Sequence, residues 1–457
     1  MPYEPPKNGF RTFIFLWLTQ SVSVIGTALT VFAINIWLVQ VAYPLPEQQP
    51  QLAGALSAFN LCFGIPVMLT TPLAGAWADR HDRKQTMLVT DLLSGGMSLL
   101  LMFFMLTDRL TLPVLLPATV LFSMISAFHG SAFDTSYAML VEDKRLPRAN
   151  AMMQTMWSLS NIISPALAAF LISMPALARQ GVMPQFLAGL SNGAPLAIGL
   201  DALSFFLAAA VLPFLVVPSP KRKDLDASGK PRKSMLADIR EGAVYIWRRR
   251  PMLWLLGTFA VVNLCSPFGV LMPLLVKFNL AADWSVRGFT LETAMALLNT
   301  FTGIGGLAAG VVISAWGGLK NRRVYGVVVP LLLAGLIQMG IGSSTLLYLT
   351  TAFSFLLTAV IPMANVHSQA IWQSQTPREL QGRVFAVRRV IAQCLGPIGI
   401  ALAGWLAGAH NPGTVLTVMG AIVAVVCFLQ LFNPHLLRVD NKEYLDDLAA
   451  RAAAGDD

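Results

Sequence analysis

Long apolar stretches alternate with short polar connections along almost the whole chain. Twelve of them come close to or exceed the roughly 20 mostly apolar residues that a helix needs to cross a membrane. They cover residues 12–41, 51–74, 86–106, 113–137, 150–176, 194–216, 252–276, 292–315, 324–342, 345–372, 384–408 and 413–433. Membrane barrels are built instead from strands of about 10 residues that alternate apolar and polar positions. The pattern therefore predicts an all-α membrane protein with twelve transmembrane helices.

A charged segment divides the twelve helices into two sets of six. We therefore expect an N-terminal bundle over residues 1–217, a cytoplasmic linker over 218–250, a C-terminal bundle over 251–437 and a cytoplasmic tail over 438–457. Inside the linker, residues 234–250 regain a helical period with their apolar positions on one face. That period favours an amphipathic helix at the membrane surface over a merely solvated linker.

The two halves repeat one another in their polar connections. Ala76-Trp77 is followed at a fixed spacing by the basic pair Arg83-Lys84, and Ala315-Trp316 and Arg322-Arg323 keep the same separation about half a chain later. Equal spacing of this kind is expected of a duplicated half. The sequence thus predicts two related six-helix bundles.

Composition and charge agree with a membrane location. Of the 457 residues, 55% are hydrophobic and 12% are charged, whereas soluble domains carry about 25% charged residues. The net charge of +9 would suit a nucleic-acid partner, but all of the 32 Lys and Arg except Arg109, Arg179, Lys277 and Arg287 fall in the termini and in alternate connections. This positive-inside asymmetry predicts a multi-pass protein of the cell inner membrane. Both termini should be cytoplasmic, and we expect no bound nucleic acid.

The connection after the second helix resembles the cytoplasmic loop signature of the major facilitator superfamily, Gly-x-x-x-Asp-Arg-x-Gly-Arg-Lys. It reads Gly75-Ala76-Trp77-Ala78-Asp79-Arg80-His81-Asp82-Arg83-Lys84. It departs at Asp82, where the superfamily usually has glycine, and this departure is common in the macrolide-efflux branch. Three further phrases are similar to that branch: Ser23-Val24-Ile25-Gly26-Thr27, Asp201-Ala202-Leu203-Ser204-Phe205 and Gly382-Arg383-Val384-Phe385-Ala386-Val387.

The resemblance implies the major facilitator fold, with two six-helix bundles that rock around a central substrate path. It also implies a monomeric secondary active transporter that exports hydrophobic or amphipathic small molecules, drug-like or macrolide-like, in exchange for protons. Antiporters of the superfamily carry a Gly-Pro motif in helix 5, of which this chain keeps Pro165 and loses the glycines. An exporter of lipids or siderophores on the same fold is the alternative.

Other classes of function find little support in the residues. We find no Gly-rich phosphate loop, no HExxH pattern and no pair of intramembrane aspartates suited to hydrolysis. Cys62, Cys265, Cys394 and Cys427 lie in separate apolar runs without ligand-type spacing. We therefore expect no cofactor, no metal and no enzymatic activity, with a membrane-embedded enzyme or a channel as the remaining alternatives to a transporter.

The resemblance also assigns a gating role to the loop signature. An aspartate at a membrane boundary can accept hydrogen bonds from the unpaired N–H groups of a nearby helix start, and the superfamily pattern would set Asp79 against the start of helix 11. We call this the closing contact, because it would hold the cytoplasmic side shut; a charge cluster that only fixes topology is the alternative. The candidate gating residues are Gly75, Asp79, Arg80, Arg83, Lys84, Gly382 and Arg383.

Polar residues inside spans are costly, so they are candidates for the substrate path. Helices 1 and 10 carry polar residues on one face at three- and four-residue spacing, and the resemblance places helices 1, 4, 7 and 10 around the cavity. The candidate cavity residues are Gln20, Ser23, Thr27, Thr30, Asn263, Ser266, Asn365, Gln369 and Trp372. Hydroxyls that bond the preceding turn or a neighbouring helix are the alternative. We interpret His129 and His367 as packing residues.

Four acidic residues lie near or within the spans: Asp91, Asp134, Asp201 and Glu292. Asp91 and Glu292 are close to helix ends, where both can stay hydrated. Asp201 follows the start of helix 6 near Ala194 by seven residues, which places it about 10 Å into the hydrocarbon core, at a depth where the sequence has no Lys or Arg. We therefore hypothesise that Asp201 carries the coupling proton. Asp134 is the second candidate, and a structural hydrogen bond is the alternative role of Asp201.

Overall fold

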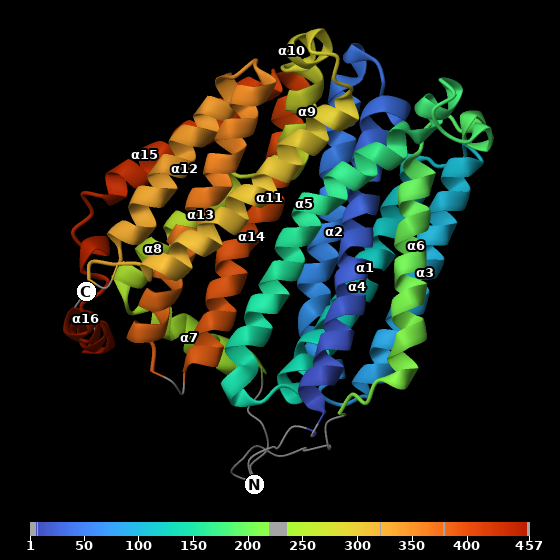
Figure 1. The fold of residues 1–457 in the computed structure, drawn as a ribbon. Helices are drawn as coiled ribbons and strands as arrows, with labels where there is room; N and C mark the ends of the chain where they lie inside the picture. The colour runs from blue at the N-terminus through green and yellow to red at the C-terminus, as the bar shows by residue number, and fades with distance from the viewer. Residues whose placement is uncertain (1–5, 7, 219–234, 320, 378–379, 455–457) are drawn as a thin grey trace. The chain divides into compact units, whose positions relative to one another are not determined.

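The computed structural model describes residues 6, 8–218, 235–319, 321–377 and 380–454, and these residues form helices joined by short connections, with no β-strand among them. Twelve helical segments are long and apolar enough to cross a membrane, which confirms the predicted number and positions (Figure 1). Those of the N-terminal half are α1 (Gly9–Trp37), which continues as a π-helix over Leu38–Ala42, α2 (Gln49–Ala78), α3 (Arg83–Leu106), α4 (Leu112–Leu140), α5 (Leu146–Arg179) and α6 (Ala194–Val211).

The C-terminal half contains six further spans and three short helices. The spans are α8 (Arg250–Leu264) with α9 (Phe268–Phe278), α11 (Leu291–Trp316), α12 (Tyr325–Ser343), α13 (Leu347–Gln375), α14 (Gln381–Ala409) and α15 (Pro412–Gln430). The short helices are α7 (Met235–Trp247), α10 (Ala281–Val286) and α16 (Lys442–Ala454). α7 falls within the residues expected to form the amphipathic linker helix, whereas linker residues 219–234 lie outside the described residues.

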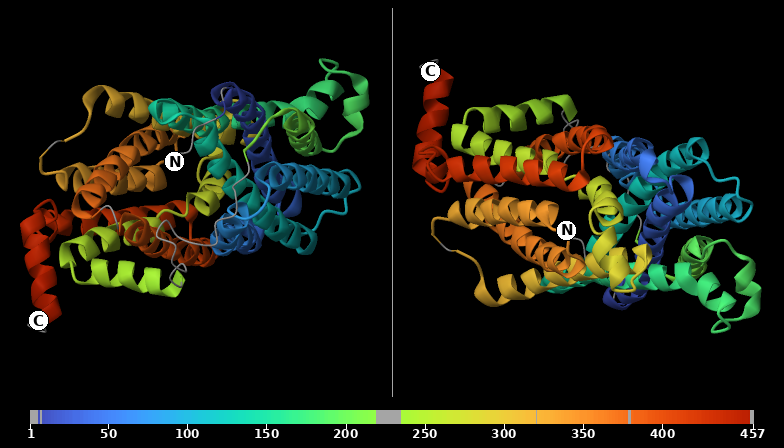
Figure 2. Two further views of the ribbon diagram at one scale, coloured as in Figure 1. Left: turned by 90° about the horizontal axis from the view of Figure 1, so that it is seen from below. Right: turned by 90° about the horizontal axis from the view of Figure 1, so that it is seen from above.

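The helices group into two compact units. One unit comprises α1 to α6 together with Trp284–Gly303, and the other comprises α7 to α9 and the chain from Ile304 onward. In the first unit, α1 packs on α5 and α6, α2 on α4, and α3 on α4 and α6; in the second, α12 packs on α13 and α15, and α14 on α7 and α8. Figure 2 gives two further views of these neighbours. α11 is shared, because its first half belongs to the first unit and its second half to the second.

Apolar side chains occupy both the interior and the outer faces of the helices. Phe13 and Leu16 of α1 form a buried cluster with Met87 of α3 and Leu140 of α4. Large apolar side chains also remain exposed along the spans, such as Leu203 of α6, which is 63% exposed. Soluble proteins rarely expose large continuous apolar surfaces, whereas lipid tails would cover these residues in a membrane.

The seventh span departs from the single helix predicted over residues 252–276. It breaks between α8 and α9, just before Pro267, whose backbone has no N–H to donate. The carbonyl oxygen of Cys265 at this break accepts a hydrogen bond of 2.8 Å from Nε2 of Gln338, a buried residue of α12. A backbone carbonyl without a partner is costly in lipid. Gln338 therefore stabilises the break.

Candidate functional site

The loop signature lies at the junction of α2 and α3, at one end of the first unit. Arg83 opens α3 and is buried, although it is charged. Its guanidinium donates from Nε to the carbonyl oxygen of Ala78 and from Nη1 to that of Thr135, both at 3.1 Å. Nη2 lies 3.9 Å from Oδ1 of Asp79, which is exposed just beyond the end of α2. Because a cation stabilises a helix end whose carbonyls are unpaired, Arg83 stabilises the end of α2 at Ala78, and its bond to Thr135 links this end to α4.

Asp82, where the signature departs from the superfamily pattern, is the N-cap of α3. Its side chain accepts a hydrogen bond of 2.9 Å from the backbone N–H of Gln85. Aspartate is among the preferred N-cap residues, since its carboxylate satisfies a donor that the helix leaves unpaired. Lys84 adds a second anchor, because its Nζ donates to the carbonyl oxygen of Pro213 beyond α6 at 2.7 Å. The sequence interpretation missed this N-cap. The signal was present, because an aspartate directly before the start of a helix is a common N-cap residue.

The remaining gating candidates differ in their surroundings. A Cβ atom at Gly75 would meet open space, and Arg80 is exposed. In the second unit, Gly382 and Arg383 lie in the first turn of α14. Nη1 of Arg383 donates to Oε2 of Glu241 on α7 at 2.6 Å, so this arginine links α7 to α14. The closing contact joins residues of the two units and stays a prediction.

The corresponding loop of the second half is built differently. Gly317 and Gly318 leave α11 with φ of 76° and 77°, a left-handed conformation that glycine adopts without steric cost. The backbone N–H of Leu319 then donates to Nε2 of His367 on α13 at 2.8 Å, while Nδ1 of His367 lies 2.7 Å from the carbonyl oxygen of Met363. His367 therefore carries its proton on Nδ1, and it anchors this loop in addition to packing.

The polar stripe of α1 faces α3 and α6 inside the first unit. Gln20, Ser23 and Thr30 are buried, and Thr27 is partly buried. The Ser23 hydroxyl donates to the carbonyl oxygen of Ser204 on α6 at 3.3 Å. These side chains thus bond neighbouring helices, as the alternative interpretation expects, and their part in the substrate path stays a prediction.

Asp201 is fully buried where α1, α3 and α6 meet. The hydroxyls of Thr30 on α1 and Ser98 on α3 donate to its Oδ2 at 2.7 and 2.9 Å. A Cβ atom at Gly26 would lie 2.7 Å from Oδ1 and 2.5 Å from the Ser204 hydroxyl oxygen, so only glycine fits there. No cation pairs with Asp201 among the residues that the structure describes. Two of the phrases that resemble the macrolide-efflux branch therefore meet at this carboxyl group.

A second buried carboxylate lies on α3. Oδ1 of Asp91 is 3.0 Å from Nε2 of His129 on α4, and its Oδ2 accepts a hydrogen bond of 3.4 Å from Nε2 of Gln20 on α1. Asp91 is fully buried, and the side chain of His129 is 18% exposed. The two groups are therefore close, but the pair does not have the geometry of a hydrogen bond.

The sequence interpretation missed this pair, because it treated Asp91 as hydrated and His129 as a packing residue. Asp91 lies eight residues beyond the start of α3, and His129 lies eleven residues before the end of α4. At about 1.5 Å for each residue, these positions reach similar depths from the same end of two consecutive antiparallel helices. Matching the depths of titratable residues on neighbouring helices could have found the pair.

The other two acidic candidates are less enclosed. Asp134 is exposed on α4. Glu292 of α11 accepts a hydrogen bond of 3.0 Å from Nε2 of Gln40, in the π-helical end of α1. Asp91 and Asp201 are thus the two fully buried carboxylates of the described chain. The same residues include no group of three or more His, Cys, Asp and Glu placed to hold a metal ion.

The seventh span and α13 supply the cavity candidates of the second unit. Asn263 is exposed on α8, and its Nδ2 donates to the carbonyl oxygen of Ala392 on α14 at 2.8 Å. Ser266, at the break after α8, bonds the carbonyl oxygen of Val262 at 2.7 Å. Asn365 is exposed on α13. The two asparagines are therefore the cavity candidates of this unit that stay most accessible.

The last two cavity candidates contact an arginine. Gln369 of α13 accepts a hydrogen bond of 2.7 Å from Nη1 of Arg388 on α14, and the Ser368 hydroxyl receives a second bond of 3.2 Å from Nη2. The guanidinium also lies 5.2 Å from the ring centroid of Trp372, which is buried. Neutral hydrogen-bond acceptors and an aromatic face therefore hold a cation between α13 and α14.

Comparison with known proteins agrees with this fold and with the loop signature. The model of the Major Facilitator Superfamily matches residues 16–399. Macrolide efflux protein A of Streptococcus pyogenes is 26% identical over 441 residues, covering 93% of this chain and 97% of that protein. Multidrug efflux pump Tap of Mycolicibacterium fortuitum is 24% identical over 391 residues, covering 82% and 86%. These relatives confirm the resemblance to the macrolide-efflux branch.

A solved transporter structure has the same fold. The bacterial homolog of the human lysosomal transporter Spinster, in its inward-facing and unoccupied conformation, superposes with a TM-score of 0.63 and covers 98% of this chain and 96% of its own. At 15% sequence identity this likeness is one of fold alone. The family match covers most of the chain, and the twelve spans agree with it. The chain belongs to the major facilitator superfamily of membrane transporters.

Proposed function

We propose that this transporter exports hydrophobic or amphipathic small molecules, of the drug or macrolide type, by alternating access in exchange for protons. Its similarity to a macrolide efflux protein and a multidrug efflux pump supports export. The observation that carries the coupling is Asp201, a fully buried carboxyl group held by hydroxyl donors from two other helices.

The partners of Asp201 suit a group that gains and loses a proton. A hydroxyl can donate to a carboxylate, and after rotation it can accept from a carboxylic acid. Thr30 and Ser98 can therefore satisfy both forms without any change in packing. Because Asp201 joins α1, α3 and α6, its protonation would change the hydrogen bonding between three helices at once.

The buried pair of Asp91 and His129 is the alternative carrier. There the imidazole of His129 lies 3.0 Å from the carboxylate, so the pair can persist as a structural contact. Asp134 is the remaining candidate from the sequence, and its side chain is exposed on α4. Variants of these residues, described in the Discussion, separate the three sites.

An efflux assay tests the substrate class. Cells that lack their own exporters and express this chain should accumulate less of several amphipathic dyes and macrolides than cells with the empty vector. Collapse of the proton gradient should restore accumulation. Unchanged accumulation of every amphipathic compound, with export of a lipid or a siderophore instead, would contradict the proposal and favour the alternative exporter.

The proposed cytoplasmic location of both termini has its own test. In a chain whose four native cysteines are replaced by serine, Glu47→Cys precedes α2 and Glu443→Cys lies in α16, and both positions are exposed. A membrane-impermeant thiol reagent added to intact cells should label the first variant and leave the second unlabelled until the cells are opened. Labelling of Glu443→Cys in intact cells would show that the C-terminus lies outside, which contradicts the proposed topology.

A further inference from the structure

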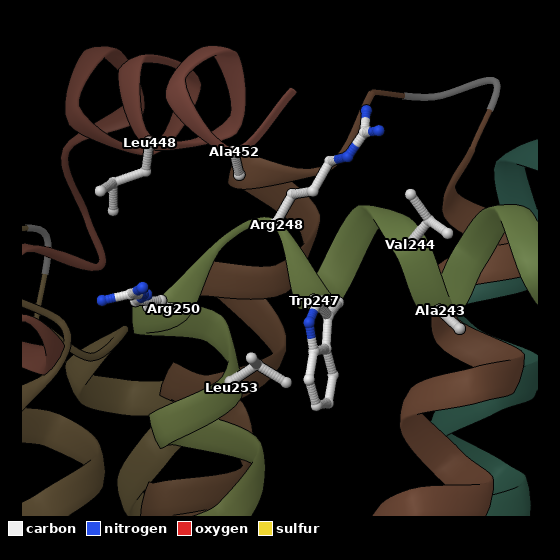
Figure 3. A pocket seen from close by; sticks show the side chains of 8 residues that line it. All are labelled: Ala243, Val244, Trp247, Arg248, Arg250, Leu253, Leu448 and Ala452. Carbon is white, nitrogen blue, oxygen red and sulfur yellow. The ribbon is translucent and has the colours of Figure 1, made fainter. Parts of the chain in front are cut away.

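A cavity of about 720 Å³ lies in the second unit between α7, the start of α8 and α16. Its lining combines two cationic side chains with apolar ones, as Figure 3 shows. The residues that matter are Arg248, Arg250, Val244, Trp247, Leu253 and Leu448. No carboxylate belongs to this lining in the described part of the chain. None of these residues takes part in the transport function proposed above.

Three consecutive arginines at the junction of α7 and α8 have different surroundings. Arg249 pairs with Asp446 of α16 at 2.9 Å, and its guanidinium lies 3.8 Å from the ring centroid of Tyr245. The middle arginine is thus neutralised, and it holds α16 against the junction. Arg248 and Arg250 line the cavity and are exposed, and the described residues offer Arg248 no acidic partner. Two guanidinium groups that line one cavity attract an anionic headgroup.

The cavity also lies where a span begins. The candidate span Arg250–Phe278 starts at its edge, and Trp247 is 75% exposed beside it. In Figure 3 the ring of Trp247 and the side chain of Leu253 lie on the side toward which α8 runs, whereas Arg248 extends the other way and Arg250 points away from Arg248. Tryptophan is enriched at membrane–water interfaces, and arginine extends toward the headgroups. A phospholipid has the same arrangement, with a charged headgroup above apolar acyl chains.

We propose that this cavity binds one anionic phospholipid from the adjoining leaflet. Arg248 and Arg250 attract the anionic headgroup from two sides, and Trp247, Val244 and Leu253 contact the upper part of the acyl chains. The cavity has the size of a site for a drug-sized group, so the rest of the chains stays in the bilayer. Clusters of basic residues next to a transmembrane helix attract anionic lipids in this way.

A lipid fits the lining better than a free anion does. Inorganic phosphate would use the two arginines and leave the exposed indole of Trp247 in water. A lipid uses both parts of the lining, and its headgroup would lie between the junction and α16. The occupied site would therefore hold α16 in place together with the ion pair of Arg249 and Asp446.

Native mass spectrometry of the full-length protein with added lipid tests this proposal. Wild type should bind one phosphatidylglycerol in preference to phosphatidylcholine. The double variant Arg248→Gln/Arg250→Gln should bind phosphatidylglycerol about 25-fold more weakly, at about fivefold for each charge removed near the lipid. The matched control is Lys442→Gln/Arg451→Gln, which removes the same charge from α16 outside the cavity lining and should bind as wild type does.

Two further variants protect the test against a folding defect. Arg248→Lys/Arg250→Lys keeps both charges and should retain the preference for phosphatidylglycerol. Trp247→Ala keeps both arginines, and it should weaken binding of the lipid without changing its preference over phosphatidylcholine. Equal binding of phosphatidylglycerol by the glutamine variant and the control would overturn the proposal. Displacement of the lipid by millimolar inorganic phosphate would overturn it too, because the site would then take a free anion.

Discussion

Asp201→Asn is expected to abolish proton-driven accumulation of substrate in proteoliposomes, while exchange of substrate in the absence of a pH gradient continues. Asparagine has nearly the size of aspartate, and its side-chain oxygen can still accept from Thr30 and Ser98, but its amide cannot take up a proton. Accumulation should therefore fall to the level seen without an imposed pH gradient. Proton movement, followed with a pH-sensitive dye inside the vesicles, should no longer depend on substrate.

The matched control for this experiment is Asp91→Asn, which changes the other fully buried carboxylate of the first unit. We expect this variant to unfold at a lower temperature, because it removes the partner of His129, and to retain accumulation. The reverse result, with coupling lost in Asp91→Asn and kept in Asp201→Asn, would assign the proton to the pair. Coupling retained by both variants would leave Asp134 as the candidate to replace.

A second large effect is expected at Arg83, where alanine should lower both transport and thermal stability. The guanidinium satisfies the carbonyls of Ala78 and Thr135 from a buried position. Loss of its donors should cost about 1–3 kcal/mol at the carbonyl of Ala78, the last residue of α2, which is left unsatisfied. Thermal unfolding of the purified variant measures the first effect, and dye efflux from cells measures the second. Arg83→Lys, which keeps the charge and gives up the planar set of donors, should recover part of the stability.

Asp79→Asn separates gating from stability within the same loop. Asp79 is exposed and lies 3.9 Å from Arg83, so its loss should change the thermal stability little. Transport should nevertheless fall strongly, since we propose that Asp79 makes the closing contact with the start of α14. Normal efflux in both Asp79→Asn and Arg83→Ala would mean that the loop only sets the topology.

The spans could be predicted from the sequence because the bilayer imposes a single requirement on the backbone. Every N–H and C=O group in lipid needs an internal partner, so a long apolar run must be a helix. The break before Pro267 was missed, because a proline alone does not say whether another helix can satisfy the interrupted backbone. The answer depended on Gln338, which lies in a different span and reaches the carbonyl of Cys265.

The buried polar contacts were harder to predict. A helical period shows which residues share one face of a helix, but it does not show which other helix packs on that face. Gln20, Ser23 and Thr30 share a face as expected, yet their partners, Asp91, Ser204 and Asp201, belong to α3 and α6. The burial of Asp201 agrees with the depth argument, because that argument needed only its distance from a helix start. The pairing of Asp91 with His129 needed a comparison between two helices.

The sharing of α11 between the two units has a mechanical consequence. A Cβ atom at Gly303 would lie 2.9 Å from the side chain of Ile162 on α5, and two residues later one at Gly305 would clash with the backbone of Phe355 on α13. Gly303 therefore fits closely against α5 of its own unit, and Gly305 fits closely against α13 of its own unit. In the rocking cycle that we propose, α11 would have to bend, and the glycines are where its backbone bends most easily. Stiffening it with Gly306→Ala, where a Cβ atom meets open space, would then slow turnover and leave substrate affinity unchanged.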